Sequence, residues 1–426
     1  MARCAIQNRS KAATLTADAA ATDDLRRAQH LMTATAVREQ CARVFARIES
    51  GESPHFAFHP QALAPIADRV ATLTRERFPD LEVPLHARWR HFETGGIDRF
   101  GALAAARNWT SEAEAARAMG DLAIVSVLLD AGAGPTWRFT EHATGTVAGR
   151  SEGLALAAFS MFASGAFSAV PADPLRADAD GLQSLTAKEF EAGFQIGADN
   201  PIAGADGRRA LLGGLADAIR TAPDLFALED GPRPGGLIDS LAADATDNAL
   251  PASAILAAVL EGLSPIWPSR LTLAGQPMGD VWLHPDLPDT GPGGRYVPFH
   301  KLSTWLSLSL IEPLAVRGIT VTDLDALPGL AEYRNGGLFV DGGALTPREP
   351  TAGPHTVDSP LIVEWRAATV ALLSRLAPMV RERLGADLPL AAILEGGTWL
   401  AGRQLAAETR ADGGPPIAII SDGTVF

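Results

Sequence analysis

Apolar residues recur every three to four positions along most of the chain, which predicts a mainly helical fold. This spacing is clear at residues 34–48, 62–78, 108–130, 151–162, 210–219, 305–314, 363–384 and 401–409. In addition, Glu189 follows Thr186 by three positions, which is the spacing of a capping box, so another helix is expected to begin there. Turn clusters rich in glycine and proline separate these segments.

Signals for β-strands are few and short. Residues 271–273 and 281–283 flank a turn that contains glycine and proline, which predicts a hairpin-like pair. Residues 338–340 and 416–420 are two further runs that are expected to be extended. The chain shows no series of alternating strands and helices, no glycine-rich dinucleotide fingerprint and no internal repeat. The predicted fold is mainly α with a minor β element.

The composition predicts one large domain with an N-terminal extension. Residues 1–30 are rich in Ala, Thr and Asp without a strong apolar stripe, which indicates a flexible N-terminal arm. The chain has 426 residues, of which 47% are hydrophobic, which is compatible with one large domain or two, and we expect residues 31–426 to form a single catalytic domain. The cluster Gly-Pro-Arg-Pro-Gly-Gly at 231–236 is the best candidate for a subdomain boundary.

The charge balance limits the partners that the protein is expected to bind. The formal net charge of −14 argues against non-specific binding to nucleic acid or to an anionic membrane. A small phosphorylated substrate remains compatible, because one local cluster of Arg and Lys is sufficient to hold it. No run of about 18 apolar residues is present, and residues 1–9 lack the apolar segment of a secretory signal. A cytoplasmic protein is therefore expected.

Cysteines and metal-binding spacings contribute little to the chemistry. Cys4 and Cys41 are too few and too near the N-terminus for a disulfide framework. The spacings typical of zinc sites are absent, so neither a metal nor another cofactor is expected. The Gly-x-Ser-x-Gly pattern of a serine nucleophile is also missing. The candidate chemistry therefore depends on carboxylates.

Two carboxylates stand in informative positions. Asp130 ends an apolar helical run and precedes the turn cluster at 131–135. A carboxylate at a helix C-terminus opposes the macrodipole, so a substrate hydroxyl or a neighbouring Arg is expected to hold it. The alternative is a structural carboxylate that bonds the amides of the turn. Glu332 opens the motif Glu-Tyr-Arg-Asn-Gly-Gly, where the alternative is a structural ion pair with Arg334.

Other polar and aromatic residues accompany these carboxylates and are candidates for binding a substrate. The cations are Lys301, Arg334, Arg366 and Arg403, which could converge on a phosphate, although each alone is more often a surface or ion-pairing residue. The remaining candidates are His91, His300, Tyr333, Asn335 and Trp399. A lone His is usually structural, and most Trp side chains belong to the core.

A set of longer motifs carries a family resemblance. They occupy residues 89–99, 126–134, 266–270, 297–301, 332–337, 363–366, 394–399 and 421–426. In this order, from about Thr35 to the last residue, the chain closely resembles the fungal and bacterial uracil-catabolism family known as uracil catabolism protein four. The resemblance implies a pathway that converts uracil to its nucleotide, opens the ring with a cyclohydrolase-like partner enzyme, and ends in urea and a three-carbon acid.

A weaker, local resemblance suggests a reaction. The stretch from Lys301 through Glu332-Tyr-Arg to Leu345 is similar to the tail of the queuosine-salvage N-glycosylases, whose helical fold looks like that of DNA base glycosylases. Glu332 stands where those proteins have Asp, which keeps a carboxylate but lengthens it by one methylene. The resemblance implies a metal-independent N-glycosidase that cleaves a ribosyl-urea phosphate or a related N-riboside 5-phosphate, with Glu332 or Asp130 as its catalytic carboxylate.

Two alternatives remain open at this point. The first is a ring-opening or amide hydrolase of the same pathway. The second is a non-catalytic protein that channels a labile intermediate from the cyclohydrolase-like enzyme. Release of urea from the ring-opened nucleotide product would distinguish the glycosidase from both.

Overall fold

Helices dominate the part of the chain that the structure describes, as the apolar periodicity predicts. The computed structural model describes residues 22–130, 132–134, 136–267, 271–349 and 353–420. The predicted helices are confirmed as α2 (Ala34–Glu49), α3 (Leu63–Arg77), α6 (Glu112–Leu128), α7 (Arg150–Ala163), α10 (Ala205–Thr221), α17 (Pro360–Leu384) and α19 (Trp399–Thr409). The fold class is mainly α with a minor β element.

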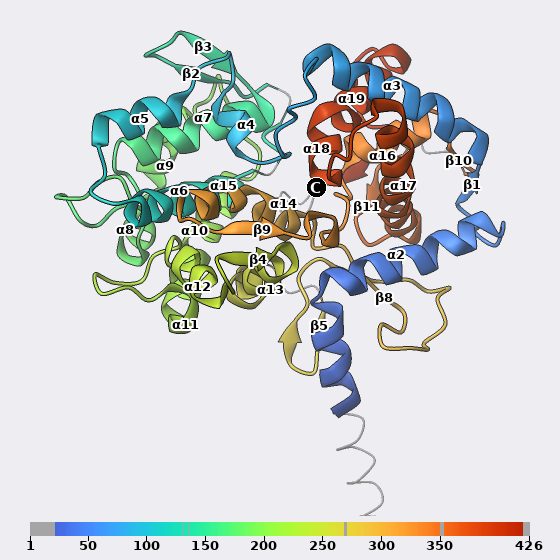
Figure 1. Ribbon diagram of the computed structural model, residues 1–426, viewed down its shortest axis with the longest axis horizontal. Coiled ribbons are helices and arrows are strands. Elements are labelled where there is room, and N and C mark those ends of the chain that lie inside the picture. The colour runs from blue at the N-terminus through green and yellow to red at the C-terminus, as the bar shows by residue number, and fades with distance from the viewer. Residues whose placement is uncertain (1–21, 131, 135, 268–270, 350–352, 421–426) are drawn as a thin grey trace, which may run out of the picture.

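The middle of the chain forms a first lobe at the left of Figure 1, coloured from light blue to yellow-green except for residues 301–316, which are orange. In this lobe α6 packs against α7 and α10. Further helices of this lobe are α4 (Trp89–Phe92), α5 (Arg99–Arg107), α8 (Ala179–Ser184), α9 (Ala187–Gly193), α11 (Pro223–Phe226), α12 (Gly236–Asp244), α13 (Ala252–Leu263), α14 (Lys301–Ser309) and α15 (Ile311–Val316). Of these, α12, α14 and α15 also pack against α6, which is therefore the central helix of the lobe.

Two distant parts of the sequence, blue and red in Figure 1, form a second lobe. Its long helix α17 packs against α2 and α3, and α19 packs against α3 in the same lobe. The remaining elements of this lobe are α16 (Tyr333–Asp341), α18 (Leu390–Ile393) and the π-helical turn η4 (Leu394–Thr398). Because α16 packs against α19 and η4 packs against α3, the two ends of the chain build one lobe together.

Side-chain caps explain where two of the helices begin. Ser111 accepts a hydrogen bond from the amide of Glu114 (3.2 Å) and starts α6. Thr186 and Glu189 form the predicted capping box of α9. In both cases, the cap satisfies amides that have no partner inside the helix.

The single helix expected over residues 305–314 is wrong in one respect, because the structure has α14 and α15, which meet at Leu310. Pro313 lacks the N–H that would bond the carbonyl of Ser309 in a continuous helix. That carbonyl instead accepts a hydrogen bond from Nε1 of Trp89 (2.8 Å). The break therefore follows from a proline and is stabilised by a residue of the neighbouring segment.

The β element consists of short two-stranded pairs that occur between the helices along the chain. The described residues contain six two-stranded sheets. The antiparallel pairs are β1 (Phe56–Phe58) with β10 (Leu345–Pro347), β2 (Phe139–Glu141) with β3 (Thr146–Ala148), β5 (Thr272–Leu273) with β6 (Gln276–Pro277), and β7 (Val281–Leu283) with β8 (Tyr296–Pro298). The parallel pairs are β4 (Ala249–Pro251) with β9 (Thr320–Thr322), and β11 (His355–Thr356) with β12 (Ile419–Ile420).

The predicted pairing of residues 271–273 with 281–283 is wrong. Ala274 and Gly275 both have positive φ (50° and 76°), so they close a two-residue turn and pair β5 with β6 directly. β7 is then left to pair with β8. Residues 338–340 are also not extended, because they lie inside α16, whose cap and buried face outweigh the strand preference of a three-residue run. The run at 416–420 is extended at β12, as expected.

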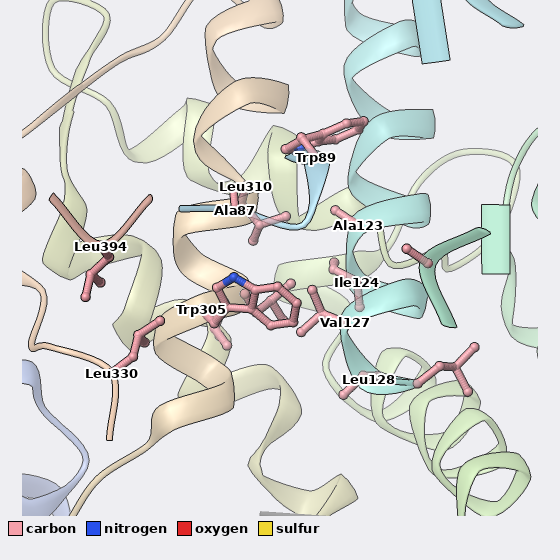
Figure 2. Packing of buried hydrophobic residues seen from close by; sticks show 14 of the residues in the cluster. Ala87, Trp89, Ala123, Ile124, Val127, Leu128, Trp305, Leu310, Leu330 and Leu394 are labelled. Atoms are coloured by element: carbon pink, nitrogen blue, oxygen red, sulfur yellow. The ribbon is translucent and has the colours of Figure 1, made fainter. Parts of the chain in front are cut away.

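Trp305 connects α14 to the apolar core of the first lobe. Figure 2 shows its indole beside Ile124, Val127 and Leu128 of α6, with Leu330 near its other side. These residues belong to one cluster of buried apolar side chains that extends through both lobes. The core therefore fixes α14 against α6, and α14 begins with the candidate site residue Lys301.

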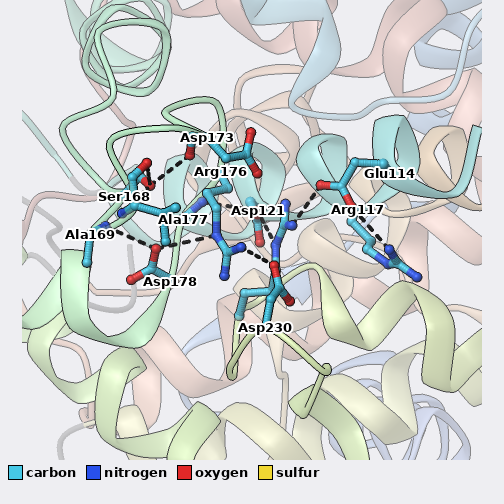
Figure 3. Close-up of polar contacts among 12 residues, drawn as sticks. Glu114, Arg117, Asp121, Ser168, Ala169, Asp173, Arg176, Ala177, Asp178 and Asp230 are labelled. Carbon is cyan, nitrogen blue, oxygen red and sulfur yellow. Dashed lines mark hydrogen bonds and ion pairs between the residues drawn. The ribbon is translucent and has the colours of Figure 1, made fainter. Parts of the chain in front are cut away.

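A buried polar network surrounds Asp121 of α6 (Figure 3). The carboxylate of Asp121 accepts hydrogen bonds from the amides of Ala177 (3.0 Å) and Gly235 (2.6 Å). It also accepts from Nε (3.0 Å) and Nη2 (2.6 Å) of Arg233, which binds Glu114 (2.7 Å) as well. Because all of these donors come from the protein, the Asp121 carboxylate is paired without any ligand.

Some predicted features fall outside the described residues. These are residues 1–21 of the expected arm with Cys4, positions 131 and 135 of the turn cluster, residues 268–270 of one motif and the motif at 421–426. Residues 22–31 are helical, and the expected boundary at 231–236 lies inside the first lobe before α12. No helix among the described residues is long and apolar enough to cross a membrane. The likeness to DNA base glycosylases stays a prediction.

Candidate functional site

Residues of both lobes line a cavity of about 420 Å³. The end of α6 and the start of α7 contribute its wall from the first lobe, together with α14. The second lobe contributes α16, α19 and the segment before β12. The titratable lining residues are His86, His91, Asp130, Arg150, Glu152, Lys301, Glu332, Tyr333, Arg334 and Arg403. The two candidate carboxylates, far apart in sequence, therefore line the same cavity.

Asp130 is held by a neighbouring arginine, one of the two partners that its position predicts. Nη1 of Arg88 donates to Oδ1 of Asp130 (2.9 Å), and the hydroxyl of Ser151 donates to Oδ2 (3.1 Å). Arg88 is fully buried, and its Nε donates to the hydroxyl of Ser126 (2.7 Å). A charge-assisted contact of this kind offsets the unfavourable helix C-terminus and keeps the carboxylate at the cavity wall.

Glu332 is the N-cap of α16. Its carboxylate accepts hydrogen bonds from the backbone amides of Arg334 (2.7 Å) and Asn335. These amides hold it in place, rather than the ion pair with the Arg334 side chain that was the structural alternative. Burial raises the pKa of the Glu332 carboxyl, while the two amides and the charge of Lys301 act in the opposite direction. Each carboxylate oxygen retains a second lone pair that a ligand or water could use.

Lys301 is electrostatically coupled to both carboxylates. It begins α14, and its amide donates to Oδ2 of Asp280 (3.1 Å). Burial and the charge of Arg366 lower the pKa of the Lys301 ammonium, whereas Glu332, Asp280 and Asp130 raise it. The ammonium therefore lies in the field of the carboxylates that line the cavity.

His86 is a lining residue that the sequence did not single out. Its Nδ1 lies 2.9 Å from Oε2 of Glu395, and Nη2 of Arg77 lies 3.0 Å from Oε1 of the same carboxylate. The bonds to His86 and Arg77 lower the pKa of Glu395 despite its burial. The result is a histidine oriented by an ionised carboxylate in the wall of the cavity.

His91 is also at the cavity but has a different character. Burial, together with the charge of Arg88, lowers the pKa of His91 to about 3. Its ring stands edge-on to the indole of Trp305, with centroids 5.6 Å apart. It is therefore a neutral imidazole at physiological pH, suited to packing or to hydrogen bonding rather than to carrying charge.

Three arginines line the cavity. Arg334 stacks on Tyr333 (4.8 Å to the ring centroid), and its Nη1 donates to the carbonyl of Gly413 (2.9 Å). Arg403 stacks on Trp399 (5.5 Å) and lies 3.7 Å from Glu152. Arg150 is exposed at the start of α7. The second lobe thus presents two predicted cations, each beside a predicted aromatic residue.

Three predicted site residues lie outside the cavity lining. Arg366 forms a two-pronged ion pair with Asp280 (2.7 and 2.8 Å). The ring of His300 contacts the carbonyl of Leu31 (2.9 Å), and the amide oxygen of Asn335 accepts from Thr398 (2.9 Å). These side chains support the wall from behind, because their neighbours Lys301 and Arg334 are the residues that reach the cavity.

Sequence reasoning missed His86, Arg88, Arg150, Ser151 and Glu395 as part of this region. One signal was available for Ser151, because it precedes an apolar run at the start of a predicted helix. The partnerships of Arg88 and His86 depend on contacts between distant segments and have no local pattern. No group of three or more His, Cys, Asp or Glu residues suited to a metal ion occurs within the described ranges.

Comparisons with known proteins agree on one family. Residues 30–426, which include every lining residue, match the family described as protein of unknown function DUF1688. The chain is 36% identical over 433 aligned positions to a protein of Lachancea kluyveri named uracil catabolism protein 4, covering 92% of this chain and 97% of that protein. It is also 36% identical over 405 positions to protein urg3 of Schizosaccharomyces pombe, covering 92% and 96%.

Proposed function

Because the chain belongs to the DUF1688 family, as its motifs predict, we propose from the name of its Lachancea kluyveri relative that it acts in uracil catabolism. Within that role, it is an N-glycosidic hydrolase. Its substrate is a ribosyl-urea 5-phosphate or a related N-riboside 5-phosphate. The observation that carries the proposal is the single cavity lined by Asp130, Glu332 and Lys301 together.

The two carboxylates suit the chemistry of a breaking glycosidic bond. Cleavage passes through an oxocarbenium-like state, which a nearby negative charge stabilises and which a positioned water captures. Asp130 is held by Arg88 and Ser151, so its charge can face the developing cation. Burial raises the pKa of Glu332, and a carboxylate of higher pKa is a better acceptor for the proton of the attacking water.

The cations suit the phosphate of the same substrate. Lys301, Arg334 and Arg403 line the cavity, and guanidinium groups match the oxygens of a phosphate. Arg334 and Arg403 each lie over an aromatic ring, which restricts their motion and limits the entropy lost on binding. An acidic protein can thereby hold an anion at one local site.

The direct test is product analysis with purified protein and N-ribosylurea 5-phosphate. We expect urea and ribose 5-phosphate to form in equal amounts. NMR or a coupled urea assay would measure their formation. Ammonia without urea would indicate an amide hydrolase instead. Binding without any product would indicate a protein that only carries the intermediate, and either result would refute the glycosidase.

A further inference from the structure

The pair of His86 and Glu395 is built in a way that the sequence does not reveal. Glu395 lies in η4, a π-helical turn, which adds a residue to a helix and is often found at functional sites. Arg77 binds the Glu395 carboxylate and also its backbone carbonyl and that of Gly396 (3.3 Å). The backbone of His86 is fixed as well, since its amide donates to the carbonyl of Ala391 (3.0 Å). Both members of the pair are thus held by the second lobe.

The orientation of the imidazole leaves one nitrogen for the cavity. Nδ1 is used by Glu395, and Nε2 has no hydrogen-bond partner among the described residues. The titratable groups around the ring are Glu395 of η4, Arg77 at the end of α3, His91 of α4 and Glu332 at the start of α16. The charge of His86 lowers the pKa of Glu332, against the larger effect of burial. His86 is therefore close enough to the proposed base to share one substrate with it.

We propose that His86 is the general acid of the reaction and that Glu395 is the residue that positions it. The assignment rests on the proposed function, because it identifies the donor for the departing nitrogen. A protonated imidazole donates from both nitrogens, so Nδ1 can remain on the Glu395 carboxylate while Nε2 faces the substrate. The same arrangement of a base oriented by a buried carboxylate recurs in unrelated hydrolases.

The reaction balances as follows. The oxygen of water forms a bond to C1 of the ribose, and the C1–N bond breaks with its electron pair on the urea nitrogen. That nitrogen takes the proton from Nε2 of His86, and the Glu332 carboxylate takes a proton from the water. The products are urea and ribose 5-phosphate, and solvent returns the proton from Glu332 to His86.

The test compares two leaving groups on one protein preparation. Urea needs a proton to depart, whereas 4-nitrophenolate does not, so the second substrate is 4-nitrophenyl riboside 5-phosphate. His86→Gln should lower kcat/KM for ribosylurea 5-phosphate by about 10²–10⁴-fold and leave the nitrophenyl substrate nearly unaffected. It should also remove the limb of the pH profile on which activity falls as pH rises. Because both rates come from one sample, the ratio is independent of the fraction folded.

Two further variants complete the design. Glu395→Gln keeps the volume but presents an amide to Nδ1, and it should reduce only the ribosylurea rate. His59→Gln is the matched control, since that histidine contacts Thr346 (3.1 Å) and does not line the cavity. Equal losses of kcat/KM on both substrates, or an unchanged pH profile, would overturn the role of His86 but not the proposed function. A wild-type protein that cleaves neither substrate would instead refute the proposed function and the assignment with it.

Discussion

Asp121 and Glu332 are both carboxylates removed from bulk solvent, yet they are satisfied in opposite ways. Asp121 accepts four hydrogen bonds, two from backbone amides and two from the buried guanidinium of Arg233. Glu332 accepts two amide bonds at a helix N-terminus, and its remaining lone pairs belong to a residue that lines a cavity. The first arrangement is complete within the protein, whereas the second leaves lone pairs of a carboxylate at the wall of a cavity. Full internal pairing therefore indicates stability, and partial pairing at a cavity indicates function.

The largest effect on stability should come from Asp121→Asn. The change removes the buried charge that accepts two hydrogen bonds from Arg233 and leaves the guanidinium paired only with the less buried Glu114. Breaking a buried ion pair typically costs about 3–5 kcal/mol of unfolding free energy, and chemical denaturation would measure it. The protein that remains folded should keep its kcat. A loss of kcat with unchanged stability would show that the Asp121 network takes part in function.

The converse change is Glu332→Gln. It keeps the side-chain volume and one acceptor for the α16 amides but removes the charge at the cavity. Turnover should fall by about 10²–10³-fold or more, since a lost transition-state interaction has that size. Steady-state kinetics and a thermal melt on the same sample would measure the loss of turnover and any change in stability. An active Glu332→Gln enzyme would move the assignment of the base to Asp130.

Arg334 tests whether the cavity recognises phosphate. Losing one charge-assisted contact costs about 1.5–3 kcal/mol of binding free energy. Arg334→Ala should therefore weaken the binding of ribose 5-phosphate by roughly 10- to 150-fold and the binding of ribose far less. Arg334→Lys keeps the charge but loses the planar guanidinium, so its affinity for ribose 5-phosphate should lie between those of the wild type and Arg334→Ala. Calorimetry with both ligands and increasing salt would measure this. Equal weakening of both ligands together with a lower Tm would mean that Arg334 only anchors the Gly413 segment, and Arg403 would be tested next.

His91 gives the expected dependence of stability on pH. Its folded pKa is about 3, below the ordinary value near 6.5. Between these values the unfolded chain binds a proton and the folded protein does not, so the unfolding free energy falls as the pH falls. His91→Gln should make this decline shallower between pH 6.5 and pH 4. Parallel curves for variant and wild type would show that His91 does not titrate differently in the two states.

The smallest expected effect is that of metal removal. Activity should be unchanged after dialysis against a chelator, because the proposed steps use only carboxylates, an imidazole and water. The activity of treated and untreated samples would be compared with and without added divalent ions. Loss of activity that a single ion restores would contradict the metal-independent mechanism.

The sequence predicted the two carboxylates of the candidate site better than it predicted the His86–Glu395 pair. Glu332, Tyr333 and Arg334 are adjacent in one motif, and Asp130 stands at a helix end, so local pattern was sufficient to select them. The His86–Glu395 pair spans 309 positions and needs a π-helical turn, neither of which has a periodic signal. The same limit explains the β-strands, since Ala274 adopts a positive φ that its residue type does not indicate.

The most direct test of the account is hydrolysis of N-ribosylurea 5-phosphate in water labelled with ¹⁸O. Attack at C1 places the label in ribose 5-phosphate and leaves the urea carbonyl unlabelled. Mass spectrometry at early times would locate the label. Unlabelled ribose 5-phosphate in the same water is the control for exchange of its oxygen with solvent. We predict that the sugar phosphate alone gains the label beyond that control. Label in the carbon fragment of the urea, released as carbon dioxide with ammonia, would contradict cleavage of the glycosidic bond.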